Sequence, residues 1–316
     1  MRLTMEPGKA PQREHHAPMA WLLLSLSPAL LASNMLVSRL AADWVPPLSL
    51  TFWRWLLTGL ILSAAVFPLI RANVWSVCRE WRGLLLLGST GMTLCGAASY
   101  LAGQTTTTAN IALIYASSPV LMTLLARWFL HERLGISRVA GIVLCLAGIM
   151  VIVARGEPRT LAGLRFDRGD LWALAGSVGW AVFSFLQIRI PSKLAVNVRL
   201  AAMALAGALV AAPFAVVEST RIGGFPFTRS GIALLAFTVL VSSYGSYVVY
   251  ARLQKVAGVS FAGMSAYLAP IWAALYGWLF VNESLQVYHF AGAALVLPGI
   301  WLARSTPLVK EEPPIP

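Results

Sequence analysis

Long apolar runs separated by short polar connections follow one another along most of this chain. A helix needs about 20 predominantly apolar residues to cross about 30 Å of hydrocarbon. The pattern therefore predicts an all-α, polytopic membrane protein. Its ten predicted transmembrane helices are Met19–Leu40, Leu48–Ile70, Gly83–Gly103, Thr108–Leu130, Ile136–Ala154, Asp170–Ile190, Arg199–Val217, Ser230–Arg252, Val259–Val281 and Val287–Ala303.

The second half of the chain repeats the first at a shift of 151 positions. Matched prolines, glutamates and glycines do not follow from apolar composition alone, so they indicate an internal repeat. Because each half holds five predicted helices, an odd number, the second copy must enter the membrane inverted. Inverted repeats are typical of secondary transporters, whose substrate site lies near the midplane between the halves. The matched pairs include Pro119 with Pro270, Glu132 with Glu283, Gly141 with Gly292, and Gly148 with Gly299.

Composition and charge support a membrane location. Hydrophobic residues make up 58% of the 316 positions and charged residues 11%, against about 25% charged residues in soluble proteins. The net charge of +12 would be compatible with binding to nucleic acid. Most basic residues, however, lie in short connections between apolar runs, which is the distribution typical of membrane proteins. We therefore expect membrane lipids and a small-molecule substrate as partners, and no nucleic acid.

The distribution of Lys and Arg places both termini in the cytoplasm. Both a monomer and a homodimer are compatible with the sequence. The predicted organisation is a polar cytoplasmic tail at 1–18, a first five-helix repeat at 19–154, an inter-repeat loop at 155–169, a second five-helix repeat at 170–305, and a cytoplasmic tail at 306–316.

One motif occurs once in each repeat and carries a family resemblance. A proline is followed by FLHER at 129–133 or FVNES at 280–284, and then by a glycine-containing apolar helix. This arrangement resembles the EamA unit of the drug/metabolite transporter superfamily, and TFWRW around Arg54 resembles that family's aromatic-Arg signature. Among its members, the chain is similar in general character to the bacterial aromatic amino-acid exporters. The resemblance implies a ten-helix export carrier of the bacterial inner membrane.

Weakly polar faces run along six of the predicted helices. In the sixth, Trp180, Ser184 and Gln187 are spaced so that they share one face. Lipid offers such side chains no partner, so they either bond between helices or line a wet cavity. The stripe on the third helix nearly copies that on the eighth, which favours a shared substrate path. The predicted substrate-binding residues are Asn34, Ser38, Thr93, Tyr100, Tyr115, Ser118, Trp180, Ser184, Gln187, Ser243, Tyr247, Tyr250 and Tyr267.

Few charged residues lie inside the predicted helices, and this restricts the chemical class of the ligand. No Asp or Glu lies in the middle third of any helix, which disfavours a proton-coupled exporter of cationic drugs. No Lys or Arg lies on the polar stripes, which disfavours sugar phosphates. We expect Arg54 to extend toward the outer membrane surface or to pair with Asp43. The best-fitting ligand is a net-neutral, zwitterionic amino acid with an aromatic or large aliphatic side chain, exported by alternating access.

The sequence lacks the motifs of other functional classes. Three scattered cysteines, and four histidines outside the middle of any predicted helix, predict no metal site, and we expect no cofactor. An intramembrane enzyme is disfavoured because no GxSxG motif is present. A channel would need a repeated filter or a charged ring, and neither is found. The alternative function is a multidrug or other metabolite exporter of the same fold.

Several matched residues have predicted structural roles. Glu132 and Glu283 each precede a helix closely enough to accept hydrogen bonds from its first N–H groups. Pro119 and Pro270 should bend the fourth and ninth helices at matching depths. Gly141, Gly148 and their repeat partners should let neighbouring helices approach closely.

Overall fold

Helices and their connections make up the described part of this chain. The computed structural model describes residues 17–130, 136–157, 167–257 and 265–304, and no strand occurs among them. Seven helices of this part are long and apolar enough to cross a membrane, and three further helices are apolar but shorter. The all-α prediction is confirmed for these residues. Glu132, most of both tails and much of the inter-repeat loop lie outside the described residues.

The first half begins with α1, which is one continuous helix. The second and fourth predicted helices are interrupted, and the third continues through a π-helical segment. The predicted helix Leu48–Ile70 ends early at Ala65, where Val66 leaves the helical conformation (φ −118°, ψ 23°) and Pro68 enters the first turn of a new helix. The elements are α1 (Ala17–Leu40), α2 (Pro47–Ala65), α3 (Phe67–Ala72), α4 (Val74–Arg79), α5 (Trp81–Leu87), the π-helix η2 (Gly88–Leu94), α6 (Cys95–Gly103), α7 (Thr108–Ala116), α8 (Ser118–Leu130) and α9 (Ile136–Val153).

The second half contains longer regular helices. Asp167 caps α11 by accepting from Gly169 N, and Gly223 (φ +93°) ends α12 in a conformation that favours glycine. The elements are α11 (Arg168–Arg189), α12 (Val196–Ile222), α13 (Arg229–Phe237), the π-helix η3 (Thr238–Gly245), α14 (Ser246–Ala257), α16 (Ser265–Val281) and α17 (Val287–Arg304). Helix α12 extends beyond the predicted Arg199–Val217 at both ends.

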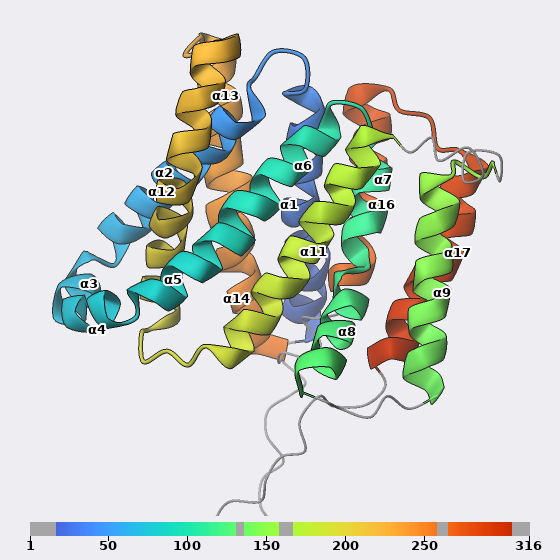
Figure 1. Cartoon of the computed structure of the whole chain (residues 1–316), viewed down its shortest axis with the longest axis horizontal. Coiled ribbons are helices and arrows are strands. Elements are labelled where there is room, and N and C mark those ends of the chain that lie inside the picture. Colours follow the sequence, from blue (N-terminus) through green and yellow to red (C-terminus); the bar gives the residue numbers. More distant parts are fainter. Residues whose placement is uncertain (1–16, 131–135, 158–166, 258–264, 305–316) are drawn as a thin grey trace, which may run out of the picture.

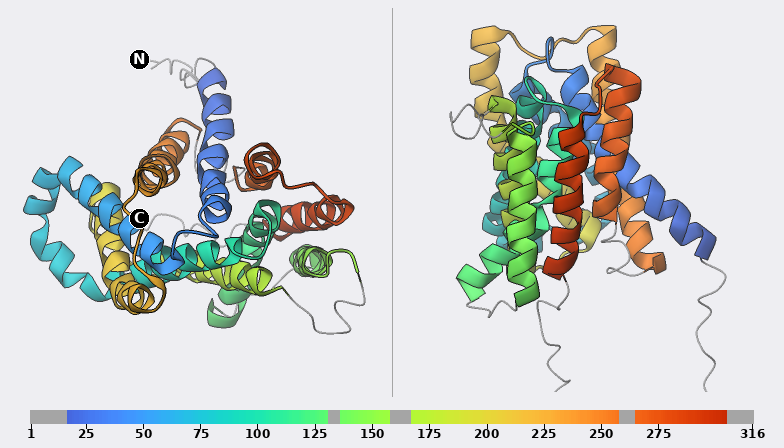
Figure 2. Two further views of the ribbon diagram at one scale, coloured as in Figure 1. Left: turned by 90° about the horizontal axis from the view of Figure 1, so that it is seen from above. Right: turned by 90° about the vertical axis from the view of Figure 1, so that its right-hand side faces the viewer.

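Two helix pairs form the sides of the bundle. Helix α2 packs along α12, and α9 packs along α17, while α1 crosses the middle against α14 and α16 (Figures 1 and 2). The connections 41–46, 104–107, 223–228 and 282–286 lie at one end, which we call the upper end after Figure 1. The connection 190–195 and both described chain ends, Ala17 and Arg304, lie at the opposite, lower end.

Glycines allow α9 and α17 to touch. A Cβ atom on Gly148 would lie 2.9 Å from the carbonyl oxygen of Gly292, and one on Gly299 would lie 2.8 Å from that of Gly141. Larger residues would force the two backbones apart. The predicted close approach at these glycines is confirmed.

The two matched prolines behave differently. The fourth predicted helix is interrupted at Ser117, so that α7 ends at Ala116 and Pro119 is the second residue of α8. By contrast, α16 continues through Pro270. The interruption thus lies two residues before Pro119, whereas the helix around Pro270 is continuous; the bends predicted at both prolines stay a prediction.

Carboxylates hold the upper end together. Glu283 accepts from Thr108 N of α7 (2.9 Å) and from Arg39 Nε of α1 (3.0 Å). Glu218 at the end of α12 accepts in the same way from Ser49 N of α2 (2.7 Å). The side chain of Glu283 was expected to bond the helix that follows it, α17. This expectation is wrong, because the helix-start N–H that it accepts from is that of Thr108 in α7.

Candidate substrate site

The centre of the site is Arg54, two turns into α2. Its side chain is buried, with only 5% exposed. Its Nε donates to Ser243 Oγ (2.7 Å), and its Nη1 donates to Asn34 Oδ1 (2.5 Å) and Tyr100 Oη (2.9 Å). These bonds join α1, α2, α6 and η3. The expectation that Arg54 extends outward or pairs with Asp43 is therefore wrong: its partners lie inside the bundle, and Asp43 is exposed in the turn after α1.

A second layer of hydrogen bonds fixes the orientation of Asn34. Its Nδ2 donates to Ser99 Oγ (3.3 Å), so its Oδ1 is free to accept from Arg54 and from the Tyr100 hydroxyl (3.0 Å). Ser38 Oγ lies 2.9 Å from Ser99 Oγ and completes the layer. Ser99 was not among the predicted residues, although a polar side chain one position before Tyr100 was a visible signal.

Aromatic rings flank the guanidinium group. The Arg54 Cζ atom lies 4.6 Å from the centre of the Trp55 ring, which is cation–π distance. Tyr247 packs edge-on to Trp55 at 6.5 Å between ring centres. The Trp55 side chain is 3% exposed, and its indole Nε1 has no hydrogen-bond partner among the described residues. We call Asn34, Ser38, Arg54, Trp55, Ser99, Tyr100 and Ser243 the Arg54 cluster.

The charge of the Arg54 cluster is not neutralised within the described part of the chain. No carboxylate there lies within ion-pair distance of Arg54. The described residues also place no hydrogen-bond acceptor on Nη2. The cluster therefore combines one cation, N–H donors and aromatic faces at a buried point, which suits an anionic or zwitterionic small molecule.

Comparison with known proteins decides the family. The EamA-like transporter family model matches residues 18–154 and 167–305. The chain belongs to the EamA-like transporter family. It is accordingly a multi-pass membrane transporter with two EamA repeats.

Curated relatives cover most of this EamA transporter. It is 26% identical over 90% of its length to an uncharacterized transporter of Archaeoglobus fulgidus, of which 96% is covered. It is 23% identical over 93% of its length to the uncharacterized transporter YetK of Bacillus subtilis, with 88% of that protein covered. A relative in Chlamydia muridarum is named an S-adenosylmethionine/S-adenosylhomocysteine transporter; the identity is 24%, covering 84% of this chain and 86% of that one.

A solved structure shares the fold. The crystal structure superposes with a TM-score of 0.57 at 21% sequence identity, covering 91% of this chain and 96% of the other. At this identity, the match supports the architecture and carries no information about the ligand.

Three of the predicted substrate-binding residues, Asn34, Tyr100 and Ser243, bond Arg54 directly. Ser38 joins them through Ser99. Tyr247 lies beside them through Trp55. Two others make contacts away from Arg54. The Tyr115 hydroxyl donates to the Cys95 carbonyl oxygen of α6 (2.8 Å), and Ser118 Oγ lies 3.1 Å from Ser177 Oγ of α11.

The remaining predicted residues lie elsewhere. Thr93 donates to the Gly207 carbonyl oxygen of α12 (2.7 Å), and Ser184 donates to the Trp180 carbonyl oxygen within α11 (2.8 Å). Trp180 packs on Phe183, and Gln187 is exposed. Tyr250 packs with an apolar group at the start of α1. The side chain of Tyr267 lies outside the described part.

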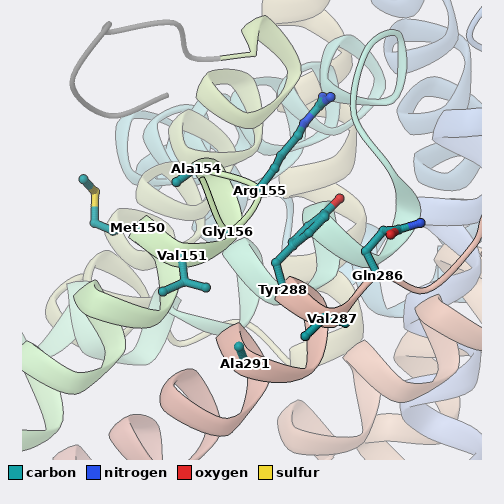
Figure 3. A pocket seen from close by; sticks show the side chains of 9 residues that line it. All are labelled: Met150, Val151, Ala154, Arg155, Gly156, Gln286, Val287, Tyr288 and Ala291. Carbon is teal, nitrogen blue, oxygen red and sulfur yellow. The ribbon is translucent and has the colours of Figure 1, made fainter. Parts of the chain in front are cut away.

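A surface pocket of about 570 Å³ opens between the upper ends of α9 and α17 (Figure 3). None of the predicted substrate-binding residues lines it. Its one charged lining residue, Arg155, is exposed and pairs with Asp167 (3.0 Å). The described residues also contain no group of three or more His, Cys, Asp and Glu that could hold a metal ion.

Proposed function

We propose that this EamA transporter exports zwitterionic amino acids, preferentially aromatic ones, across the bacterial inner membrane. The observation that carries the proposal is the Arg54 cluster, in which α1, α2 and α6 of the first repeat meet η3 of the second. An ionisable side chain inside a membrane helix is costly, so its presence marks a substrate pathway. Trp55, Tyr100 and Tyr247 offer flat apolar faces to an aromatic side chain.

Transport would proceed by alternating access between two inverted five-helix repeats, 19–154 and 170–305. Three observations support this arrangement. The sequence repeat supplies matched motifs, the π-helices η2 and η3 begin 150 residues apart at Gly88 and Thr238, and both described chain ends lie at the lower end. In this arrangement ten helices cross the membrane, both termini are cytoplasmic, and motion of one repeat against the other would expose the cluster to each side in turn.

A second candidate substrate is S-adenosylmethionine or S-adenosylhomocysteine. The chlamydial relative that carries this name aligns with 84% of the chain. Both compounds join an α-amino acid group to an aromatic adenine, so they present the same two features that the Arg54 cluster would recognise. The proposed site therefore accommodates either class.

The test is transport by purified protein in liposomes. Radiolabelled phenylalanine, tyrosine, tryptophan, leucine, lysine and S-adenosylmethionine are compared, with protein-free liposomes as the control. We expect saturable uptake that is fastest for the aromatic amino acids and absent for lysine. Uptake of S-adenosylmethionine alone would favour the second candidate, and uptake of lysine at the rate of phenylalanine would contradict both.

A further inference from the structure

We infer that Arg54 binds the carboxylate of the transported molecule, so that the carboxylate, and not the ammonium group, is the part of the ligand that the site requires. This inference rests on the proposed function and specifies which chemical group is recognised. Its starting point is that Arg54 is a buried cation with no described carboxylate within ion-pair distance.

Burial makes the charge of Arg54 costly. A guanidinium group moved out of water loses its hydration, and only a nearby anion or a full set of hydrogen bonds offsets that loss. Arg54 is 5% exposed and bonds three neutral groups on Asn34, Tyr100 and Ser243. A ligand anion beside it would be strongly favoured because the surrounding dielectric constant is low.

Every described carboxylate has a position or a partner away from Arg54. Three of them bind helix ends or connections at the margins of the bundle: Glu218 with α2, Glu283 with α7, and Glu80 with Lys193 N. Asp170 accepts from Thr106 Oγ1 and Asn110 Nδ2, and Asp167 pairs with Arg155. Asp43 and Glu157 are exposed. No described carboxylate therefore supplies a counter-charge to Arg54, and we assign that role to the ligand.

The unused donors match a carboxylate. Nε and Nη1 of Arg54 are occupied, which leaves the Nη2 edge of the planar guanidinium for an oxygen acceptor. The neighbouring Trp55 contributes an indole N–H that is buried without a partner. Gly96 lies against it, and a Cβ there would lie 3.1 Å from Nε1. These groups donate and do not accept, so they favour the carboxylate end of a zwitterion.

Among the described residues, the ammonium group has no comparable site beside Arg54. No described carboxylate lies within ion-pair distance of Arg54, and the hydroxyls of Ser38 and Ser99 already bond each other. Two buried acceptors without a partner, Asp170 Oδ2 and Asn110 Oδ1, belong to α11 and α7, which contribute no residue to the Arg54 cluster. Removing the ammonium group from the ligand should therefore cost less affinity than removing the carboxylate. This separates carboxylate recognition from amine recognition within one set of compounds.

The test measures binding, as thermal stabilisation of the detergent-solubilised protein, alongside transport in liposomes. The ligands are phenylalanine, 3-phenylpropionate (no ammonium), and phenethylamine and phenylalaninamide (no carboxylate). We expect 3-phenylpropionate to bind within about tenfold of phenylalanine. The two compounds without a carboxylate should bind about 10- to 150-fold more weakly, which is the range for hydrogen bonds to a charged group.

Variants test whether the preference for carboxylates depends on Arg54. Arg54→Gln should lose the preference for carboxylates. Arg54→Lys should keep part of it, because the charge remains while the planar guanidinium with its paired N–H donors is lost. Arg127→Gln, on an exposed position of α8, is the control and should behave like the parent. Because the ligand comparison uses the unaltered protein, it gives a result even if an Arg54 variant does not fold.

The outcomes distinguish the two proposals. Equal binding of phenethylamine and 3-phenylpropionate, or an unchanged preference in folded Arg54→Gln, would overturn the inference. If carboxylates bind by way of Arg54 but phenylalanine is not transported, the inference stands and the proposed substrate is wrong.

Discussion

Arg39 and Arg54 are two arginines that meet different surroundings in the same bundle. Arg39, at the upper end of α1, has a carboxylate partner: its Nε donates to Glu283 (3.0 Å) and its Nη1 to the Gly103 carbonyl oxygen (2.5 Å). Arg54, deeper in the bundle, bonds only neutral groups. The paired arginine links α1, α6 and the connection before α17, which is a structural role. The unpaired one keeps its charge available, which is what a substrate site needs.

The largest effect is expected when Arg54 is given a carboxylate partner of its own. In Asn34→Asp, the new carboxylate would lie 2.5 Å from Nη1 in place of the amide oxygen. We expect transport to fall about 10- to 150-fold, because the protein then occupies the group that the ligand needs. Thermal stability should not fall, since Tyr100 can still donate to the carboxylate and the Ser99 hydroxyl can rotate to donate as well.

Asn197→Asp controls for the added charge, because Asn197 is exposed in the first turn of α12. It should transport like the parent. An Asn34→Asp protein with parental transport would show that the charge of Arg54 does not reach the ligand.

Substitutions in the two π-helices should have smaller and different effects on transport. Ser243 in η3 and Thr93 in η2 correspond at a shift of 150 residues, yet Ser243 accepts from Arg54 while Thr93 donates to Gly207 of α12. We expect Ser243→Ala to lower transport about 3- to 10-fold, the effect of one hydrogen bond. Thr93→Ala should lower thermal stability and leave the KM unchanged. If both variants change the KM alike, the substrate path runs equally along both π-helices.

Removing the partner of Arg39 should change stability and not transport. Glu283→Gln deletes the ion pair with Arg39 and weakens the bond to Thr108 N. Because the Arg39 side chain is 27% exposed, we expect a modest loss of about 1 kcal/mol, measured by thermal unfolding. The KM and the pH dependence of transport should match the parent. A stable Glu283→Gln protein that has lost its pH dependence would instead assign Glu283 a role in coupling.

Cysteine labelling should show which end of the bundle, and therefore which side of the membrane, Arg39 lies toward. The labelled positions should not affect transport. In a Cys78→Ser background, Gly224→Cys lies in an exposed connection at the upper end and Ala195→Cys in one at the lower end. If Arg39 lies toward the outside, as the charge distribution predicts, a membrane-impermeant maleimide added to intact cells should label position 224 and not 195. The reverse pattern would contradict the proposed topology.

The helices and the repeat can be predicted from the sequence. Apolar length is a local property, so the observed helices follow the predicted ones closely except at Val66, at Ser117 and in the longer α12. The repeat glycines were correctly expected at a close contact because small residues serve the same purpose in both copies. Polar positions such as Asn34, Tyr100 and Ser243 could be selected because lipid offers them no partners.

Which of these positions meet depends on how the helices pack in the folded bundle. Hydropathy along a helix does not set how far it rotates toward a given neighbour, and Arg54 could equally have extended to the membrane surface. Its partners come from α1, α6 and η3, at distances in sequence of 20, 46 and 189 residues. The partner of Glu283 likewise comes from α7, 175 residues away. Hydrogen bonding of buried polar groups is settled by whichever donor or acceptor the packed bundle brings within reach, and no local pattern contains that information.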